Sequence, residues 1–255
     1  MMPASLKKKF SETFPGPYGF YRRLKTHFRR PQPTDLRQSY PSRVRELMRI
    51  MPEDEAMSIA VGGDYQFMGN HLVDVLKTYG LTTGHYLIDV GCGSGRVAHA
   101  LSKSDLKHNI KYMGTDISEE LLRYARKKCA VASWRFVKID SLKIPEMDDQ
   151  ADVVCFFSVF THLLPEESYL YLEEARRVVK PNGVILFTFF DFKVPDHWTI
   201  FHENIKCLKS HTPKVLDTFL SKDAVEVWAQ KLGLHPEYIG SPDGGQARCL
   251  LRKPA

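Results

Sequence analysis

Apolar residues recur with helical spacing in two stretches of the first third of the chain. Over residues 43–51 they lie three, one and three positions apart, which predicts a helix that Pro52 ends. Over residues 65–79 they form one face of a second predicted helix, and Gly80 is placed directly after its last turn. Beyond this point the pattern changes.

Short apolar runs alternate with helical patterns over the remaining residues. The runs predict seven strands, at residues 86–90, 112–115, 134–139, 153–157, 184–190, 236–239 and 247–252. Helical patterns lie between them at residues 96–103, 119–129, 166–179 and 222–232. This alternation predicts an α/β fold, in which helices cover both faces of a mostly parallel sheet. The 255 residues, 43% of them hydrophobic, supply a full core, and we divide them into a helical extension over 1–60 and a domain over 61–255.

Positive charge is concentrated at the N-terminus. Residues 1–50 hold twelve Lys and Arg residues against three acidic ones, a net charge of +9, while the rest of the chain carries −3. Aromatic residues are interleaved with the cations over residues 7–30. This mixture suits an anionic membrane surface bound through residues 1–40, or, less favoured, a nucleic-acid backbone. A segment that packs on the core is the third interpretation that the sequence leaves open.

Three absences in the sequence bear on where the protein works. The longest apolar stretches, such as residues 184–190, are far shorter than the ~18–20 residues that cross a bilayer. The lysines at residues 7–9 are not followed by the apolar run of a signal peptide. Five cysteines lie far apart without a C-x-x-C pair, which favours reduced thiols and no zinc site. We therefore expect a cytoplasmic protein, peripheral at the membrane if the N-terminus binds there, and no metal.

Residues 87–96, LIDVGCGSGR, carry the most informative motif. A buried strand delivers Asp89 and three alternate glycines, Gly91, Gly93 and Gly95, into the start of a helix. Glycines let a backbone turn sharply and approach a ligand closely. The first strand-to-helix loop of an open parallel sheet lies at the edge where ligands bind. The dinucleotide fingerprint G-x-G-x-x-G is not met, because Arg96 stands where its third glycine would be, and no P-loop lysine follows.

A second acidic residue follows at a meaningful distance. Asp116 ends the second predicted strand about twenty residues beyond the glycine loop, the spacing at which a carboxylate meets a ribose. Asp116 could instead cap the next helix, but Ser118 is already well placed as its N-cap. The two features together predict a cofactor that contains a nucleoside.

From about residue 65 to residue 253 the chain resembles the class I S-adenosylmethionine-dependent methyltransferases, whose first motif is an acidic residue followed by G-x-G-x-G. Residues 152–163, DVVCFFSVFTHL, and 176–183, RRVVKPNG, are similar to segments of bacterial small-molecule and sugar methyltransferases. The resemblance implies a Rossmann-like, doubly wound sheet of seven strands with one antiparallel strand near the C-terminus. It also implies S-adenosylmethionine as cofactor and S-adenosylhomocysteine as product.

The resemblance assigns cofactor contacts by position. Asp89 and the backbone of the glycine loop would face the methionine portion, and Asp116 would bond the ribose hydroxyls. The other implied contacts are Ile117 beside the adenine, Asp140 and Ser141 at its amino edge, and Phe157, Ser158 and Val159 closing the pocket. Asp140 is alternatively a turn residue before Pro145. Cys92, inside the loop, is expected to fill space rather than to react.

The acceptor side is less specified. Methyl transfer to a hydroxyl needs in-line geometry and a group that removes the proton. His162, directly after the fourth strand, is the candidate base, although a histidine at a helix start also caps or packs. Asp191, at the end of the fifth strand, is a candidate for orienting the acceptor or pairing with a histidine. An insertion that contains His197, Trp198 and His202 could cover the acceptor as a lid.

Several acceptor classes are disfavoured. Residues 157–160 read Phe-Ser-Val-Phe where adenine amino-methylation has Asp/Asn-Pro-Pro-Tyr/Phe, and no Pro-Cys pair follows the fourth strand. No carboxylate cluster there suggests a magnesium-dependent catechol site. We expect methyl transfer to an oxygen of a small molecule or a saccharide, including a lipid-linked one. The alternatives are an RNA or protein methyltransferase and a non-catalytic cofactor-binding module docked through the basic N-terminus.

Overall fold

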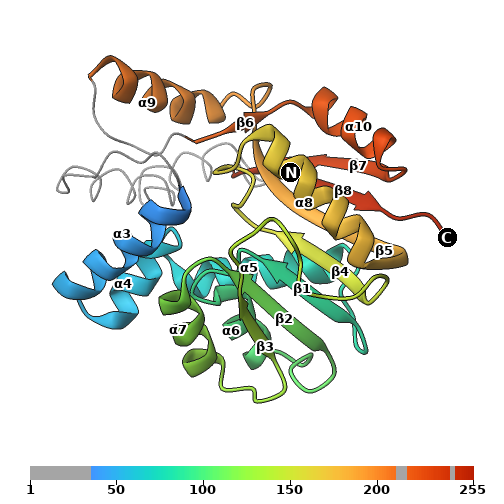
Figure 1. The fold of residues 1–255 in the computed structure, drawn as a ribbon, viewed down its shortest axis with the longest axis horizontal. Helices are drawn as coiled ribbons and strands as arrows, with labels where there is room; N and C mark the ends of the chain where they lie inside the picture. Colours follow the sequence, from blue (N-terminus) through green and yellow to red (C-terminus); the bar gives the residue numbers. More distant parts are fainter. Residues whose placement is uncertain (1–35, 211–216, 242–244) are drawn as a thin grey trace, which may run out of the picture.

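A twisted sheet forms the centre of the molecule (Figure 1), and the computed structural model describes residues 36–210, 217–241 and 245–255. Seven of its eight strands follow one another in the order β3-β2-β1-β4-β5-β8-β7, and β6 pairs with β5 beside this path. The strands are β1 Tyr86–Val90, β2 Lys111–Asp116, β3 Arg135–Lys138, β4 Ala151–Phe156, β5 Val179–Asp191, β6 Phe219–Leu220, β7 His235–Gly240 and β8 Ala247–Arg252.

The strand directions confirm the predicted sheet. β1 is parallel to β2 and β4, and the pairs β2–β3, β4–β5 and β5–β6 are parallel as well. β8 runs antiparallel to both of its neighbours, β5 and β7. The strand order changes direction between β1 and β4, so the loops at their carboxyl ends diverge there and leave room for a ligand.

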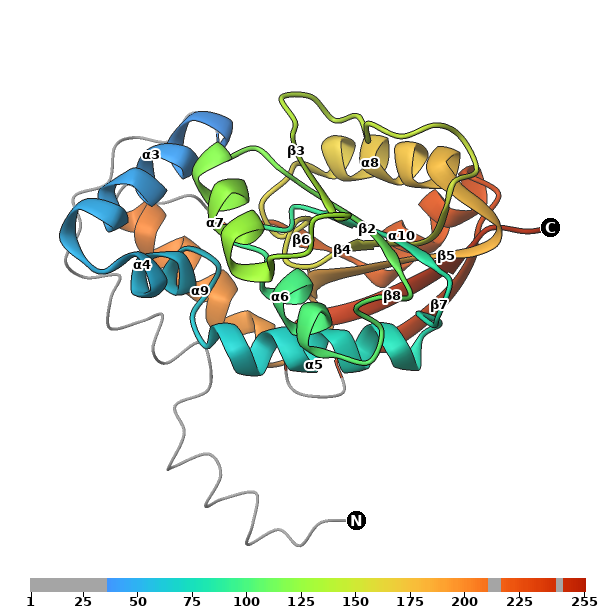
Figure 2. The ribbon, with the colours of Figure 1, turned by 90° about the horizontal axis from the view of Figure 1, so that it is seen from below.

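Helices cover both faces of the sheet, as Figure 2 shows with α8 above and α5 and α6 below. Leu87 and Ile88 illustrate why: they are adjacent on β1 and both fully buried, but they belong to opposite hydrophobic clusters. Leu87 packs with residues of α5 and α6, and Ile88 with residues of α8 and α10. The helices are α5 Tyr65–Thr78, α6 Arg96–Lys103, α7 Glu119–Cys129, α8 Pro165–Val178 and α10 Lys222–Lys231.

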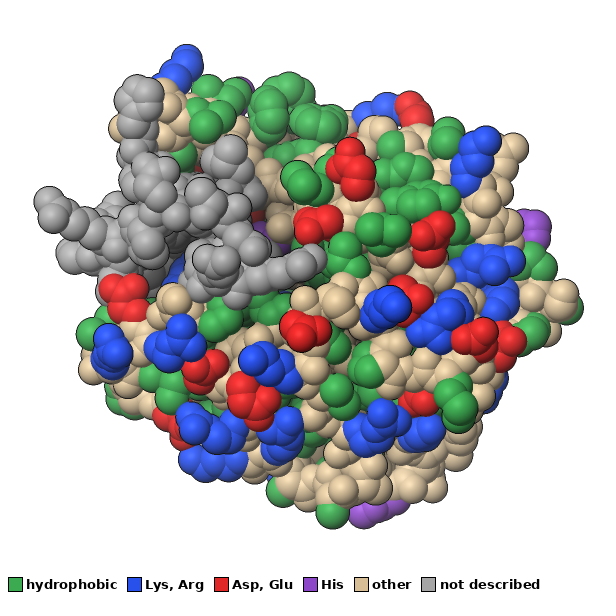
Figure 3. Space-filling view, viewed as in Figure 1, with side chains coloured by type: hydrophobic (Ala, Val, Ile, Leu, Met, Phe, Trp, Pro, Cys, Tyr) green, Lys and Arg blue, Asp and Glu red, His purple; other side chains and the backbone are tan. Residues whose placement is uncertain are grey.

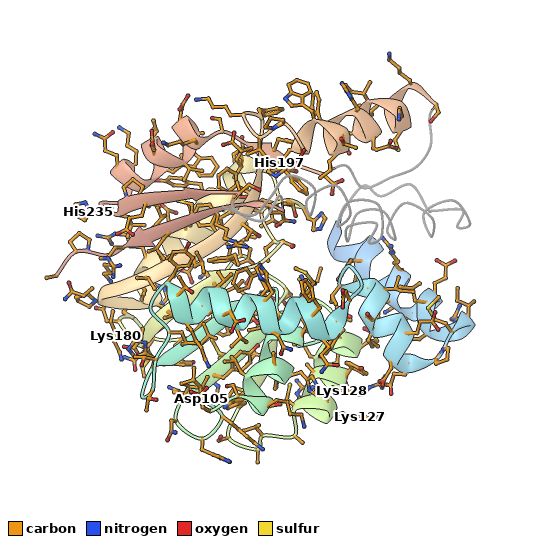
Figure 4. The ribbon with its side chains drawn as sticks, turned by 180° about the vertical axis from the view of Figure 1, so that it is seen from behind. Asp105, Lys127, Lys128, Lys180, His197 and His235 are labelled. Carbon is orange, nitrogen blue, oxygen red and sulfur yellow. The ribbon has the colours of Figure 1, made fainter. Side chains whose placement is uncertain are left out.

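Two further helices, α3 Leu36–Ile50 and α4 Glu53–Ala60, precede this domain and pack on α7. Val44 and Met57 are buried in one cluster with Leu121 and Tyr124 of α7. Ion pairs join Lys127 and Lys128 on α7, labelled in Figure 4, to acidic side chains in the first turn of α4. The described part of the predicted extension therefore docks on the domain. The rest of that extension, residues 1–35, which holds most of the segment expected to bind a membrane, lies outside the described residues.

The elements after β5 differ most from the sequence prediction. The insertion expected to act as a lid, for which no element was predicted, is a helix, α9 His197–Lys209, which extends beyond the carboxyl end of β5 (Figure 1). Its two buried residues, His197 and Asn204, are polar, whereas the apolar residues that recur at helical spacing, Trp198, Phe201, Ile205 and Leu208, stay partly or largely exposed. α4 and the two-residue β6 were not predicted either. No helix in the described ranges combines the length and the apolar character that crossing a bilayer requires.

Candidate functional site

The glycine loop between β1 and α6 turns through left-handed backbone conformations. Gly91 and Gly93 have φ values of 72° and 57°, which side chains disfavour. A Cβ on Gly91 would lie 2.5 Å from a methyl carbon of Val159, and one on Gly93 would lie 2.6 Å from a methyl carbon of Val61. The loop therefore needs glycine at both positions for conformation and for close approach.

Asp116 lies beside this loop, at the carboxyl end of β2. Its carboxylate accepts the N–H of Gly93 at 2.9 Å and the N–H of Ser118 at 2.9 Å. Burial raises the pKa of Asp116 to about 6, although these backbone N–H bonds favour its ionised form. Ser118 caps α7, as predicted, by accepting the N–H of Leu121. Each carboxylate oxygen has a second lone pair, so Asp116 can still accept hydroxyl groups of a ligand.

Asp89 lies deeper than Asp116, beneath the loop. The Tyr112 hydroxyl donates to one of its carboxylate oxygens at 2.9 Å, and the Cys155 thiol donates to the other at 3.6 Å. Burial raises the pKa of Asp89 to about 6, against the lowering effect of these two bonds. Burial also raises the pKa of Cys92 well above its usual value, so the thiol stays protonated and fills space as predicted.

The other predicted cofactor contacts surround the same loop. Ile117 is half-buried beside Asp116, and the N–H of Ile139 donates to the Asp116 carbonyl at 3.0 Å, which places the end of β3 next to it. Asp140 and Ser141 follow directly and are exposed. At the end of β4, Phe157 is buried and Ser158 has a φ of 60°, a strained conformation for a residue with a side chain. These positions remain predicted cofactor contacts.

The loop fits the adenosyl cofactor that the motif predicts. Glycines at positions 91 and 93 leave the backbone bare for a close approach, and a buried carboxylate stands beside them at the carboxyl edge of the sheet. Three hydrogen bonds hold α4, the turn after it and the start of α5 against the loop: Ser94 to Met57, Arg96 to Val61, and Tyr65 to Ser94. Because the Val61 and Val159 side chains reach the glycines at positions 93 and 91, a cofactor that contacts these glycines must displace them.

His162, the predicted base, faces an aspartate that the sequence did not indicate. Its Nδ1 lies 3.9 Å from a carboxylate oxygen of Asp217, in the segment two residues before β6 begins. Asn204 of α9 holds that segment in place, because its amide donates to the Asp217 carbonyl and accepts the Asp217 N–H. The N–H of Thr218 donates to the Thr161 carbonyl at 2.8 Å, which joins the loop after β4 to the same segment.

Asp191, the second predicted catalytic residue, is bonded to its own turn. Its carboxylate accepts the N–H of Lys193 at 2.9 Å, and its backbone N–H donates to His197 Nδ1 at 2.9 Å. His197 Nε2 then donates to the Gly245 carbonyl at 2.9 Å. His197 is buried at the base of α9 (Figure 4) and links the end of β5 to the loop before β8. The predicted pairing of Asp191 with a histidine therefore takes the form of a hydrogen bond from the Asp191 backbone N–H to His197.

Aromatic side chains pack together at the carboxyl end of β5. We call Phe190, Phe192, Trp198, Phe201 and Phe219 the aromatic cluster. Phe219 lies at its centre, with ring centroids 5.0 Å from Phe192 and 5.4 Å from both Phe190 and Phe201. The Trp198 indole donates to the Phe192 carbonyl at 3.0 Å. Phe192 and Trp198 remain 41% and 44% exposed, and Figure 3 shows hydrophobic side chains gathered on this side of the molecule.

Comparison with known proteins places this geometry in a family. The profile of a family described as a methyltransferase domain matches residues 88–187, from β1 and the glycine loop through most of β5. Residues 88–187 are thus a methyltransferase domain of the class I S-adenosylmethionine-dependent type. S-adenosylmethionine is the methyl donor of that family, which accounts for a glycine cradle beside a carboxylate. The resemblance in the sequence and the predicted fold class are both confirmed.

Two curated relatives and one solved structure illustrate the range of this methyltransferase family. A tRNA N(3)-methylcytidine methyltransferase of Schizosaccharomyces pombe is 27% identical over 108 residues, 40% of this chain and 35% of that protein. A fatty-acid O-methyltransferase of Mycolicibacterium smegmatis is 30% identical over 105 residues, 41% of this chain and 37% of that protein. The chain thus spans little more than a third of the length of each.

The solved structure is that of a magnesium protoporphyrin IX methyltransferase of Synechocystis PCC 6803 with bound S-adenosylhomocysteine. It aligns with a TM-score of 0.61 at 16% identity, over 86% of this chain and 98% of that chain. At this identity the likeness concerns the fold.

The aspartate of the His162 pair and the polar groups around Ser158 were not predicted from the sequence. Asp217 stands outside any motif, and Gln246, which bonds Ser158, precedes the last strand. Because β8 runs antiparallel to β5, the residues that precede β8 lie at the edge of the sheet where the parallel strands end.

Proposed function

We propose that this methyltransferase transfers a methyl group from S-adenosylmethionine to an oxygen of a small molecule or saccharide that carries an apolar portion. The observation that carries the proposal is the His162–Asp217 pair beside the aromatic cluster. Asp217 faces His162, and Phe219, two residues further on, lies at the centre of the aromatic cluster. The name of the fatty-acid O-methyltransferase among its relatives supports an apolar oxygen acceptor.

The chain's own residues supply positioning and proton removal. Bound S-adenosylmethionine supplies an electrophilic methyl group. Asp116 accepts the ribose hydroxyls and holds the donor at the loop, which makes the transfer effectively unimolecular. His162 takes the acceptor proton, and the Asp217 carboxylate, which faces its Nδ1, stabilises the imidazolium that forms. The aromatic cluster binds the apolar portion of the acceptor and excludes water from it.

Mutation of His162 distinguishes general-base catalysis from catalysis that only positions the donor and the acceptor. General-base catalysis contributes about 10²–10⁴-fold, so His162→Gln should lower kcat by that order while leaving the affinity for S-adenosylhomocysteine unchanged. Asp217→Asn should lower kcat less, because it removes only the stabilising charge. The assay follows labelled methyl transfer from S-adenosylmethionine to a panel of hydroxylated amphiphiles. Equal kcat in wild type and His162→Gln would assign the histidine to packing.

A macromolecular acceptor is the second candidate. The tRNA-modifying relative and the +9 charge of residues 1–50 favour it. RNA binding that weakens steeply with salt, together with label transferred to RNA, would support this candidate over the small-molecule proposal. Cofactor binding without transfer to any acceptor would instead support the non-catalytic module.

A further inference from the structure

Gln246 reaches the carboxyl edge of the sheet because of the direction of β8. β8 is antiparallel to β5, and its first residues pair with the last part of that strand, Ala247 with Phe189 and Arg248 with Thr188. The residue before Ala247 therefore lies among the loops that follow β4 and β5. Gln246 is half-buried there, 88 positions along the chain from Ser158, to which it is bonded.

The hydrogen bonds around Gln246 orient its amide. The Ser158 N–H donates to the Thr188 hydroxyl at 2.8 Å, so the proton of that hydroxyl is directed elsewhere. It is donated to Gln246 Oε1 at 2.5 Å, and the Ser158 hydroxyl donates to the same oxygen at 3.2 Å. Two donors on Oε1 leave Nε2 on the opposite side of the amide. Among the described residues Nε2 makes no hydrogen bond, so two N–H donors remain for another partner.

The backbone before Gln246 is held as well. The Gly245 carbonyl accepts bonds from His197 Nε2 and from the Ser241 hydroxyl. His197 is itself held by the Asp191 N–H, at the end of β5. A side chain supported on both sides loses little entropy when it binds a ligand, as a specificity-determining group should.

The residues around this amide connect the glycine loop, where the cofactor is expected, with the aromatic cluster, where the acceptor is expected. Val159, next to Ser158 in the chain, contacts the glycine loop at Gly91. His197, which holds the Gly245 carbonyl, contacts Phe190 of the aromatic cluster with ring centroids 5.2 Å apart. The left-handed backbone of Ser158 stores strain where the two halves meet, as functional positions often do.

We infer that Gln246 Nε2 donates a hydrogen bond to a second oxygen of the methyl acceptor, next to the oxygen that is methylated. The inference rests on the proposed function and narrows its acceptor class. The substrate is an apolar molecule with two neighbouring oxygens, such as a diol or a hydroxy-carbonyl compound, rather than a simple alcohol. His162 takes the proton from one oxygen while Gln246 holds the other. Gln246 is thus a specificity-determining residue.

Two matched probes test the inference: naphthalene-2,3-diol, which has two neighbouring oxygens, and 2-naphthol, which has one. Their binding to the full chain saturated with S-adenosylhomocysteine is measured by calorimetry. A lost neutral hydrogen bond to a site left unpaired weakens binding by roughly five- to hundredfold, so wild type should prefer the diol by that factor. Gln246→Glu keeps an oxygen for Ser158 and Thr188 but removes the donors, and it should abolish the preference, as should Gln246→Leu.

The controls separate the alternatives. Gln230→Glu, an exposed change of the same kind on α10, should keep the wild-type preference. S-adenosylhomocysteine should bind all four proteins equally, and weaker binding in both Gln246 variants would overturn the inference by assigning the amide to the cofactor. A preference that persists in Gln246→Leu, or wild type that binds neither probe, would also overturn it. The proposed function fails separately, if a bound probe never receives a labelled methyl group.

Discussion

Two buried aspartates lie at the ends of neighbouring strands and have different surroundings. Asp89 is held by the side chains of Tyr112 and Cys155, whereas Asp116 is held by backbone N–H groups at the rim of the glycine loop. Burial raises the pKa of each from 3.8 to about 6. Both stay predicted cofactor contacts, but the side-chain bonds of Asp89 tie it to the core, so we expect its protonation to affect the stability of the fold as well.

The pH dependence of cofactor binding tests the role of Asp116. The ionised carboxylate accepts ribose hydroxyls, and with a pKa of about 6 it becomes protonated below neutral pH. We expect the affinity for S-adenosylhomocysteine to fall as the pH decreases through about 6, by calorimetry between about pH 5 and pH 8. Asp116→Asn should bind more weakly throughout and lose much of this dependence. A flat wild-type profile would contradict the assignment.

The bond from Tyr112 to Asp89 predicts a pH-dependent stability. Because the folded-state pKa of Asp89 is raised, its contribution to the free energy of unfolding is fully present below about pH 3.8 and is lost as the pH rises through about 6. Tyr112→Phe removes a donor to the charged form, so it should cost about 1–3 kcal/mol near neutral pH and less near pH 4. Urea denaturation at both pH values measures the two losses, and equal losses would contradict this account.

At the scale of elements, the segment from α4 to α5 controls access to the glycine loop. Val61 reaches Gly93, and the three following residues, Gly62, Gly63 and Asp64, all have positive φ, between 44° and 104°. Consecutive left-handed residues form a defined turn that lets α4 change direction before α5 begins. The cap formed by α3 and α4 is therefore attached through this turn and through its contacts with α7 and the loop.

Shortening Val61 should favour cofactor binding. A cofactor on the loop displaces the valine side chain, and Val61→Ala removes about two buried methylene equivalents from that competition. We expect the affinity for S-adenosylhomocysteine to rise by up to about tenfold. Val227→Ala, on the exposed face of α10, should leave the affinity unchanged. Weaker binding in Val61→Ala would show that the valine packs on the cofactor instead of competing with it.

The elements that were predicted leave a local pattern in the sequence, whereas several of those that were not depend on tertiary contacts. β1, the glycine loop and α6 were predictable, because a buried strand, three glycines at fixed spacing and an amphipathic helix each leave a local pattern. α9 was missed although Trp198, Phe201, Ile205 and Leu208 recur at helical spacing in its sequence. β6 owes its existence to pairing with β5, and Asp217 and Gln246 come to the edge through tertiary contacts that no local pattern reports.

At the scale of the whole molecule, charge and apolar surface are unevenly distributed. Residues 1–35 hold eight Lys and Arg residues against two acidic ones. Within the described residues, the aromatic cluster exposes Phe192 and Trp198 on the side of α9. An acceptor with an apolar portion partitions into membranes, so an anionic membrane surface bound through the N-terminus would bring enzyme and acceptor together.

Vesicle binding tests this membrane proposal. Each Lys or Arg near an anionic surface contributes about 1 kcal/mol, so the full chain should sediment with vesicles that contain phosphatidylserine and not with phosphatidylcholine alone. Deletion of residues 1–35, which leaves α3 intact, should abolish sedimentation, and added salt should weaken it in the full chain. Undiminished sedimentation of the deleted protein would remove the support for this partner.

Calorimetric titration with S-adenosylmethionine, of wild type and Asp116→Ala, tests the central claim most directly. We predict binding in the micromolar range by wild type and a loss of about ten- to hundredfold in Asp116→Ala, the cost of about 1.5–3 kcal/mol for a charge-assisted ribose contact. NAD, offered as a control, should not bind, because the loop lacks the third glycine of the dinucleotide fingerprint. A folded wild type that does not bind S-adenosylmethionine would contradict the account.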